Sequence, residues 1–86
     1  MTLEQLRKRI DRVDRKILQL LNERAVVARR IGEIKRRQGL PIFDGKRETA
    51  VLRRVTRSNG GPLSAAAISS IFQKILQHNR RLQGKG

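Results

Sequence analysis

The chain has 86 residues, and its 21 Lys and Arg against 7 Asp and Glu give it a net charge of +14. This length suits a single domain. The absence of cysteine excludes disulfides and thiolate zinc sites, and a lone histidine cannot form a metal site. No apolar run approaches the roughly 18 residues of a membrane span, and the N-terminus lacks the apolar block of a signal peptide. We therefore expect a cytoplasmic protein that binds no metal.

The excess of basic residues indicates an anionic partner, such as nucleic acid, phosphate, anionic lipid or a carboxylate metabolite. Only two aromatic residues are present, Phe43 and Phe72, which argues against a base-stacking platform for single-stranded nucleic acid. For most of the basic residues, a solvated surface is the simpler interpretation.

The first predicted helix covers residues 3–37, from the capping-box pair Thr2 and Gln5 to the breakers at 38–41. Its apolar residues follow steps of three and four, which is typical of a helix-packing seam: Leu3, Leu6, Ile10, Val13, Ile17, Leu20, Val27, Ile31 and Ile34. Arg24 occupies the one missing position in this row. A helix of this length is about 50 Å long, so the rest of one chain cannot cover it. We therefore expect an all-α homodimer in which long helices pack together.

Two shorter helices are predicted at 45–58 and 65–83, separated by the breakers at 59–62. Asp44 suits the N-cap of the first and Ser64 that of the second. Their apolar faces are formed by Val51, Leu52 and Val55, and by Ile68, Ile71, Phe72, Ile75 and Leu76. We expect the last residues, 84–86, to be frayed.

Polar residues lie on the predicted inner face of every helix: Arg24 and Lys35, then Arg47 and Glu48, then Asn79 and Gln83. A buried charge is costly unless it is paired or matched by a ligand, so these residues could converge on one pocket inside a helical bundle. Each also has a structural interpretation, and the hypothesis of a site depends on the set.

The structural alternatives are specific. Arg24 could pair with an acid of a partner chain, and Lys35 could extend to solvent at the end of its helix. Arg47 and Glu48 could form a surface pair, and Asn79 with Gln83 a hydrogen-bonded pair on one helix.

The pocket residues offer several cations, one or two acids and two amides, with no thiol and no Ser–His pair. This set suits a small dicarboxylate and a reaction that needs only positioning and electrostatic stabilisation.

Three segments, "LRKRIDRVDRKILQLLNERAVVARRIGEIK", "PIFDGKRE" and "IFQKILQHNRRLQ", closely resemble the all-helical chorismate mutases. The resemblance extends from about Leu6 to Gln83. It implies one domain over residues 1–86, an intertwined homodimer, and conversion of chorismate to prephenate without a cofactor. It places the substrate-binding residues at Arg7 of the partner chain, Arg24, Lys35, Asp44, Arg47, Glu48, Asn79 and Gln83. The residues expected to act in catalysis are Lys35, Gln83, Arg24 and Glu48. Family members often have Ser at the place of Asn79.

Three other functions are compatible with the sequence. An isochorismate pyruvate lyase would use a similar cationic pocket, although the acids Asp44 and Glu48 favour the mutase. A basic helical dimer that binds nucleic acid would explain the 17 Lys and Arg left over when four site cations are taken from 21. A helical dimer without catalytic activity would use Arg24 only to fix the packing of its seam.

Overall fold

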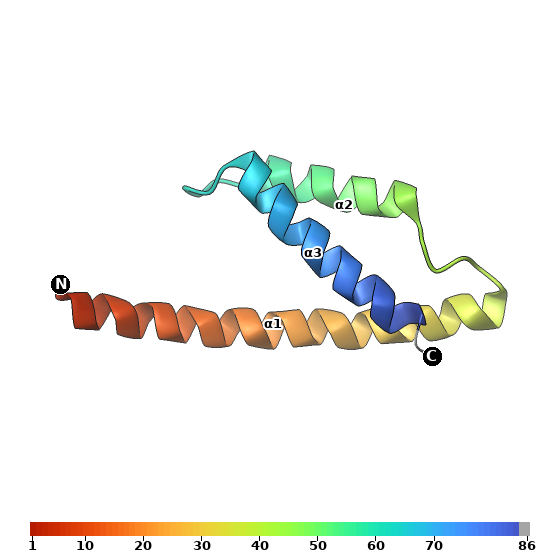
Figure 1. The fold of residues 1–86 in the computed structure, drawn as a ribbon, viewed down its shortest axis with the longest axis horizontal. Helices are drawn as coiled ribbons and strands as arrows, with labels where there is room; N and C mark the ends of the chain where they lie inside the picture. The colour runs from red at the N-terminus through yellow and green to blue at the C-terminus, as the bar shows by residue number, and fades with distance from the viewer. Residues whose placement is uncertain (85–86) are drawn as a thin grey trace.

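The computed structural model describes residues 1–84, which form three α-helices and no strand. These are α1 (Leu3–Gln38), α2 (Gly45–Ser58) and α3 (Ala65–Gly84) (Figure 1). The prediction of an all-α chain with one very long helix is confirmed. Of residues 84–86, which were expected to be frayed, Gly84 is instead the last residue of α3, and 85–86 lie outside the described residues.

The helix ends follow from local capping groups. The Thr2 hydroxyl accepts from the Gln5 amide at 3.1 Å, and the Gln5 side chain accepts from the Thr2 amide at 2.9 Å, so the predicted capping box is present. Gly39 ends α1 in the left-handed conformation, with φ of 67°, which glycine adopts without steric cost. The Ser64 hydroxyl accepts from the Ala67 amide at 3.1 Å and caps α3.

The three helices form an open arrangement rather than a compact bundle. α3 runs diagonally between the other two helices and packs against both the C-terminal half of α1 and α2 (Figure 1). The N-terminal half of α1 extends beyond this contact. The molecule measures 55 × 24 × 15 Å, and its radius of gyration is 15.9 Å. A compact globule of this length would have a radius of about 12 Å, so a single chain leaves much of α1 uncovered.

Small residues on α1 allow α3 to approach closely. Ala28 and Gly32 are buried at this contact. A β-carbon added to Gly32 would lie 2.7 Å from both Cα and the carbonyl oxygen of Gln83, which is too short for a real contact. Glycine at this position therefore brings the end of α3 onto α1. This face was not predicted from the sequence, because Ala28 and Gly32 are small and stand outside the row of larger apolar residues.

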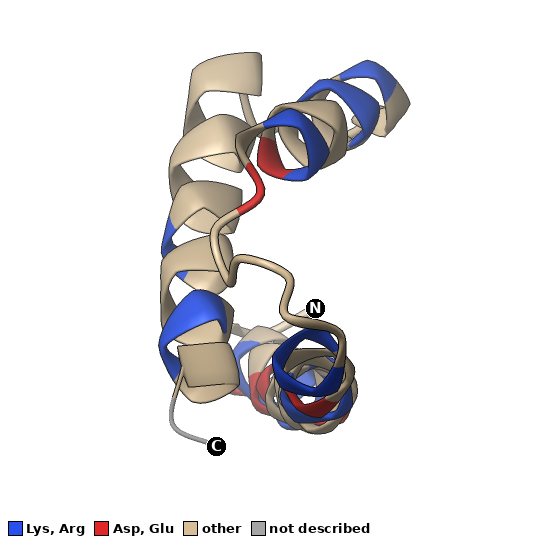
Figure 2. Ribbon diagram, turned by 90° about the vertical axis from the view of Figure 1, so that its right-hand side faces the viewer, with Lys and Arg blue, Asp and Glu red and all other residues tan. Residues whose placement is uncertain are grey.

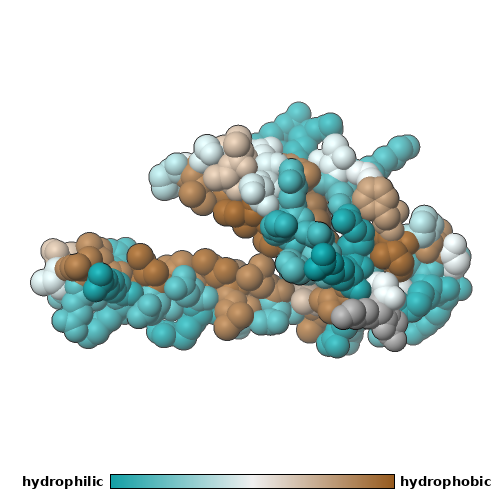
Figure 3. Space-filling view, in the orientation of Figure 1, coloured by the Kyte–Doolittle hydropathy of each residue, from teal (hydrophilic) through white to brown (hydrophobic). Residues whose placement is uncertain are grey.

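The predicted apolar row of α1 is exposed in the single chain. Figure 3 shows a stripe of hydrophobic side chains along the side of α1 that faces the overhanging α2 and α3. By their accessibility, the exposed residues of the row include Leu3, Leu6, Ile10, Val13, Ile17 and Leu20, each at least 42% exposed. In α3, Ile71 of the predicted apolar face is 47% exposed in the single chain, where the buried residues of this helix are Leu76 and Asn79. Val51 is the most buried side chain of α2.

Candidate active site

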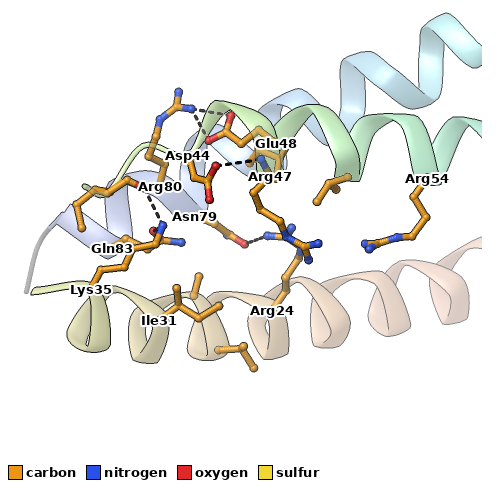
Figure 4. A pocket seen from close by; sticks show the side chains of 15 residues that line it. Arg24, Ile31, Lys35, Asp44, Arg47, Glu48, Arg54, Asn79, Arg80 and Gln83 are labelled. Atoms are coloured by element: carbon orange, nitrogen blue, oxygen red, sulfur yellow. Dashed lines mark hydrogen bonds and ion pairs between the residues drawn. The ribbon is translucent and has the colours of Figure 1, made fainter. Parts of the chain in front are cut away.

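Residues from all three helices enclose a cavity of about 460 Å³ (Figure 4). Seven of the eight predicted site residues line it: Arg24, Lys35, Asp44, Arg47, Glu48, Asn79 and Gln83. Residues that are 59 positions apart in sequence, Arg24 and Gln83, thus lie in the same wall. The convergence expected from the polar interruptions is present, whereas contacts with a substrate stay a prediction.

Arg24 is half-buried and donates a hydrogen bond from Nη1 to Oδ1 of Asn79, which is itself buried. With its oxygen engaged, the Asn79 amide nitrogen is left to donate. Burial lowers the pKa of the Arg24 guanidinium, and the positive charges of Arg47 and Arg54 lower it further. A lowered pKa in a cation means that the charged form is disfavoured where it stands. Arg24, Arg47 and Arg54 thus make this end of the cavity cationic.

Lys35 is oriented by two acceptors at the other end of the cavity. Its Nζ lies 2.8 Å from the carbonyl oxygen of Ile42 and 3.0 Å from Oε1 of Gln83. An ammonium group has three N–H donors, so one remains available. Because Gln83 accepts through its oxygen, its amide N–H groups are also free to donate. The interpretation of Lys35 as a solvent-directed residue is therefore wrong, since both of its contacts lie inside the fold.

The two acids stand in the first turn of α2. Asp44 is its N-cap, as predicted, and accepts from the amide of Arg47 at 3.1 Å. Glu48 accepts from Nη1 of Arg80 on α3, at 2.8 Å to Oε1 and 2.7 Å to Oε2. A surface pair between Arg47 and Glu48 is not what the structure shows. Nor do Asn79 and Gln83 pair with each other, since their side-chain oxygens accept from Arg24 and Lys35.

Arg7 does not line the cavity. It lies on the exposed N-terminal half of α1, 17 residues before Arg24. Along one helix this corresponds to about 25 Å. Arg7 therefore cannot reach the ligand of its own chain, and its predicted role requires the cavity of a second chain.

Several lining residues were not predicted as site residues. Arg54 lies two turns after Arg47 on the same face of α2, a spacing that could have identified it. Arg80 follows Asn79 directly, and no local pattern distinguishes it from Arg81. Val27 and Ile31, which the sequence analysis assigned to the apolar row, also form part of the cavity wall.

Residues 1–84 contain no group of three or more His, Cys, Asp or Glu side chains placed to hold a metal ion. Within the same residues, no helix has the length and apolar character needed to cross a bilayer.

Comparison with known proteins gives a family for this arrangement. The family model of chorismate mutase type II matches residues 6–84. The chain belongs to the chorismate mutase type II family. The solved chorismate mutase (Form II) of Thermus thermophilus superimposes with a TM-score of 0.95 at 37% identity, covering 96% of this chain and 94% of that one. The chorismate mutase of Helicobacter pylori in complex with prephenate superimposes with a TM-score of 0.86 at 30% identity, covering 95% and 89%.

This chain is also similar to part of a longer protein. The bifunctional chorismate mutase/prephenate dehydratase of Aquifex aeolicus is 42% identical over 87 residues, which cover 96% of this chain. This chain spans only 24% of that protein.

Proposed function

We propose that this protein is a chorismate mutase, an isomerase that converts chorismate to prephenate in the biosynthesis of phenylalanine and tyrosine from the shikimate pathway. The convergence of seven predicted residues on one cavity is the observation that carries this proposal. The cavity combines a cationic end, a pair of oriented donors and two carboxylates. Membership of the chorismate mutase type II family supports the same reaction.

The cationic end would bind the two substrate carboxylates. Arg24 and Arg47 face this space in the same chain, and Arg7 of a partner chain is the proposed third cation. Holding both carboxylates folds the enolpyruvyl arm over the ring, so that the two reacting carbons approach each other. Asn79, whose amide nitrogen is free, is placed to donate to one carboxylate. The apolar side chains of Val27 and Ile31 offer a wall for the ring.

The reaction breaks the ether C–O bond and forms a C–C bond within one molecule, so no group leaves and no external reactant enters. As the C–O bond lengthens, negative charge develops on its oxygen. The remaining N–H of Lys35 and the amide of Gln83 are the donors proposed to meet this charge, and their interaction strengthens in the transition state. Glu48, with Asp44, is proposed to orient the ring hydroxyl. No general base and no cofactor are needed.

The proposal includes a homodimer with shared active sites. Two observations support it: the exposed apolar row on α1 and the position of Arg7 outside the cavity of its own chain. Antiparallel packing of two α1 helices would cover the row and bring each Arg7 to the other chain's Arg24. The cytoplasmic location stays a prediction of the sequence.

The test of the proposed function is a spectroscopic assay of chorismate disappearance with identification of the product. Prephenate formation by the wild type is expected, and its loss is expected when Lys35 is replaced by Met. Isochorismate is assayed in parallel, because a lyase on this scaffold would release pyruvate from it. Faster turnover of isochorismate than of chorismate would replace the mutase assignment.

Nucleic-acid binding is the alternative favoured by the net charge of +14. Five of the 7 acids lie on α1, however, at Glu4, Asp11, Asp14, Glu23 and Glu33. Figure 2, which looks along α1, shows acidic and basic segments mixed around this helix. Binding to duplex DNA at physiological salt, in a protein that does not turn over chorismate, is the result that would favour this alternative.

A further inference from the structure

Arg80 makes the most extensive polar contact to an acid in the cavity, and the proposed reaction gives it no role. Its Nη1 lies 2.8 Å from Oε1 and 2.7 Å from Oε2 of Glu48, so one nitrogen bridges both carboxylate oxygens (Figure 4). The pair joins α3 to the first turn of α2. Both side chains are partly shielded, with 35% of Arg80 and 24% of Glu48 exposed.

The contact restricts Glu48 without saturating it. A carboxylate has about four acceptor positions, and the bridging nitrogen uses two of them. Among the described residues, no other group donates a hydrogen bond to the Glu48 side chain. The remaining acceptor positions are therefore available to a hydroxyl inside the cavity, while Arg80 fixes the torsion angles of the glutamate.

Arg80 is itself held in place from outside the cavity. Its guanidinium carbon lies 5.1 Å from the centre of the Phe43 ring, a cation–π distance. Phe43 stands in the segment between α1 and α2. The ring covers one face of the guanidinium, so Arg80 is directed at Glu48 by a contact on each side.

We propose that Arg80 is a positioning residue for the mutase reaction, which holds the Glu48 carboxylate in the orientation that receives the substrate's ring hydroxyl. This inference rests on the proposed function, since it assigns a role within the same site. Arg80 is not a catalytic residue in this proposal, because it acts on the substrate only through Glu48. Its removal should therefore affect turnover only while Glu48 is present.

The experiment is a double-mutant cycle with Arg80→Met and Glu48→Gln, measured as kcat and KM for chorismate in the full chain. Methionine keeps the apolar stem of the arginine and removes its charge. We expect Arg80→Met to lower kcat/KM by about tenfold, mainly through kcat. In the Glu48→Gln background the same substitution should change kcat/KM by less than about twofold.

Arg81→Met is the matched control, because it removes the same charge from the next position of α3 at an exposed site. It should leave kcat/KM within about twofold of the wild type. Arg80→Lys keeps the charge and should recover part of the activity lost in Arg80→Met. If Arg80→Met fails to fold, as judged by circular dichroism, the double-mutant cycle is measured with Arg80→Lys in its place.

Three results would overturn the inference while leaving the mutase assignment in place. These are equal losses from Arg80→Met and Arg81→Met, additive losses in the double variant, and an effect on KM alone, which would indicate direct substrate binding. A wild type that does not convert chorismate would instead refute the proposed function, and the positioning role with it.

Discussion

The close contact between Gly32 and Gln83 leads to a prediction that separates packing from catalysis. In Gly32→Ala, the new β-carbon would lie 2.7 Å from Cα and the carbonyl oxygen of Gln83. Ordinary contacts between carbon atoms are about 3.5–4.0 Å, so α3 must retreat by about 1 Å at this point. Both groups that it meets are backbone, so no side-chain rotation can relieve the overlap.

A shift of this size removes an interaction of the proposed site. The Lys35 to Gln83 hydrogen bond is 3.0 Å long, and about 1 Å more takes it beyond hydrogen-bond range. Misplacing a reacting group by 1 Å can cost about 100-fold in rate. We therefore expect Gly32→Ala to lower kcat/KM by about 10- to 100-fold, which is about 1.4–2.7 kcal/mol of transition-state stabilisation.

The effect on stability should be smaller. Overpacking costs about 1–3 kcal/mol, and replacing a mid-helix glycine by alanine returns about 1 kcal/mol of helix propensity. The net change in unfolding free energy is then between about 0 and 2 kcal/mol. It is measured by urea unfolding at matched protein concentration, because a dimer's stability depends on concentration.

Gly84→Ala is the control for this prediction. It makes the same substitution one residue beyond Gln83, where an added β-carbon meets nothing within 4 Å. Its kcat/KM should stay within about twofold of the wild type. If Gly32→Ala matched Gly84→Ala in both stability and turnover, the proposed coupling between the α1–α3 contact and the site would be refuted.

Four further predictions concern the cations of the site and are tested with the same assay. Lys35→Met should lower kcat by about 10²–10³-fold, because it removes a donor to the developing oxyanion, and a loss confined to KM would contradict this role. Arg24→Ala should lower kcat/KM by about 100-fold or more while the proposed dimer, measured by light scattering, persists. Dissociation of the dimer with normal specific activity would instead assign Arg24 to the packing seam. Co-refolding equal amounts of Arg7→Ala and Arg24→Ala chains should restore about a quarter of wild-type activity, since half of the dimers are mixed and each has one intact site. Arg54→Ala should raise KM by about 3- to 10-fold, because it reduces the attraction for a dianion, whereas Arg57→Ala, one turn further along α2 and outside the cavity wall, should not.

Local patterns in the sequence predicted the three helices and the convergence of polar residues on one cavity. Glycine and proline mark the helix ends, and the cap at Thr2 forms as the sequence predicts. A helical period of 3.6 residues was enough to place Arg24 and Lys35 on one face, and both line the cavity. Such rules work because they depend only on residues within a few turns of each other.

Contacts between residues far apart in the sequence complete the site, and local patterns do not predict them. Arg80 reaches Glu48 across 32 residues, and no spacing within α3 distinguishes it from Arg81. The α1–α3 contact was missed for another reason: Ala28 and Gly32 carry little hydropathy, so a search for large apolar residues passes over the face on which α3 packs. Small side chains allow two helices to pack closely. In the sequence such a contact is therefore marked by small residues rather than by large apolar ones.

The difference between the two halves of α1 explains the position of Arg24 in the apolar row. The row is exposed in the single chain on both sides of residue 24, and after residue 24 its members Val27 and Ile31 also line the cavity. Arg24 thus stands where α1 passes from the free half of the helix to the half that supports the site. An aliphatic residue there would extend the seam but close the cavity's cationic end. The Arg24 guanidinium is disfavoured by burial and by Arg47 and Arg54, and within residues 1–84 the Asn79 amide is its one hydrogen-bond partner. A bound dicarboxylate supplies the missing negative charge, so the same electrostatic deficit that destabilises the empty site favours the ligand.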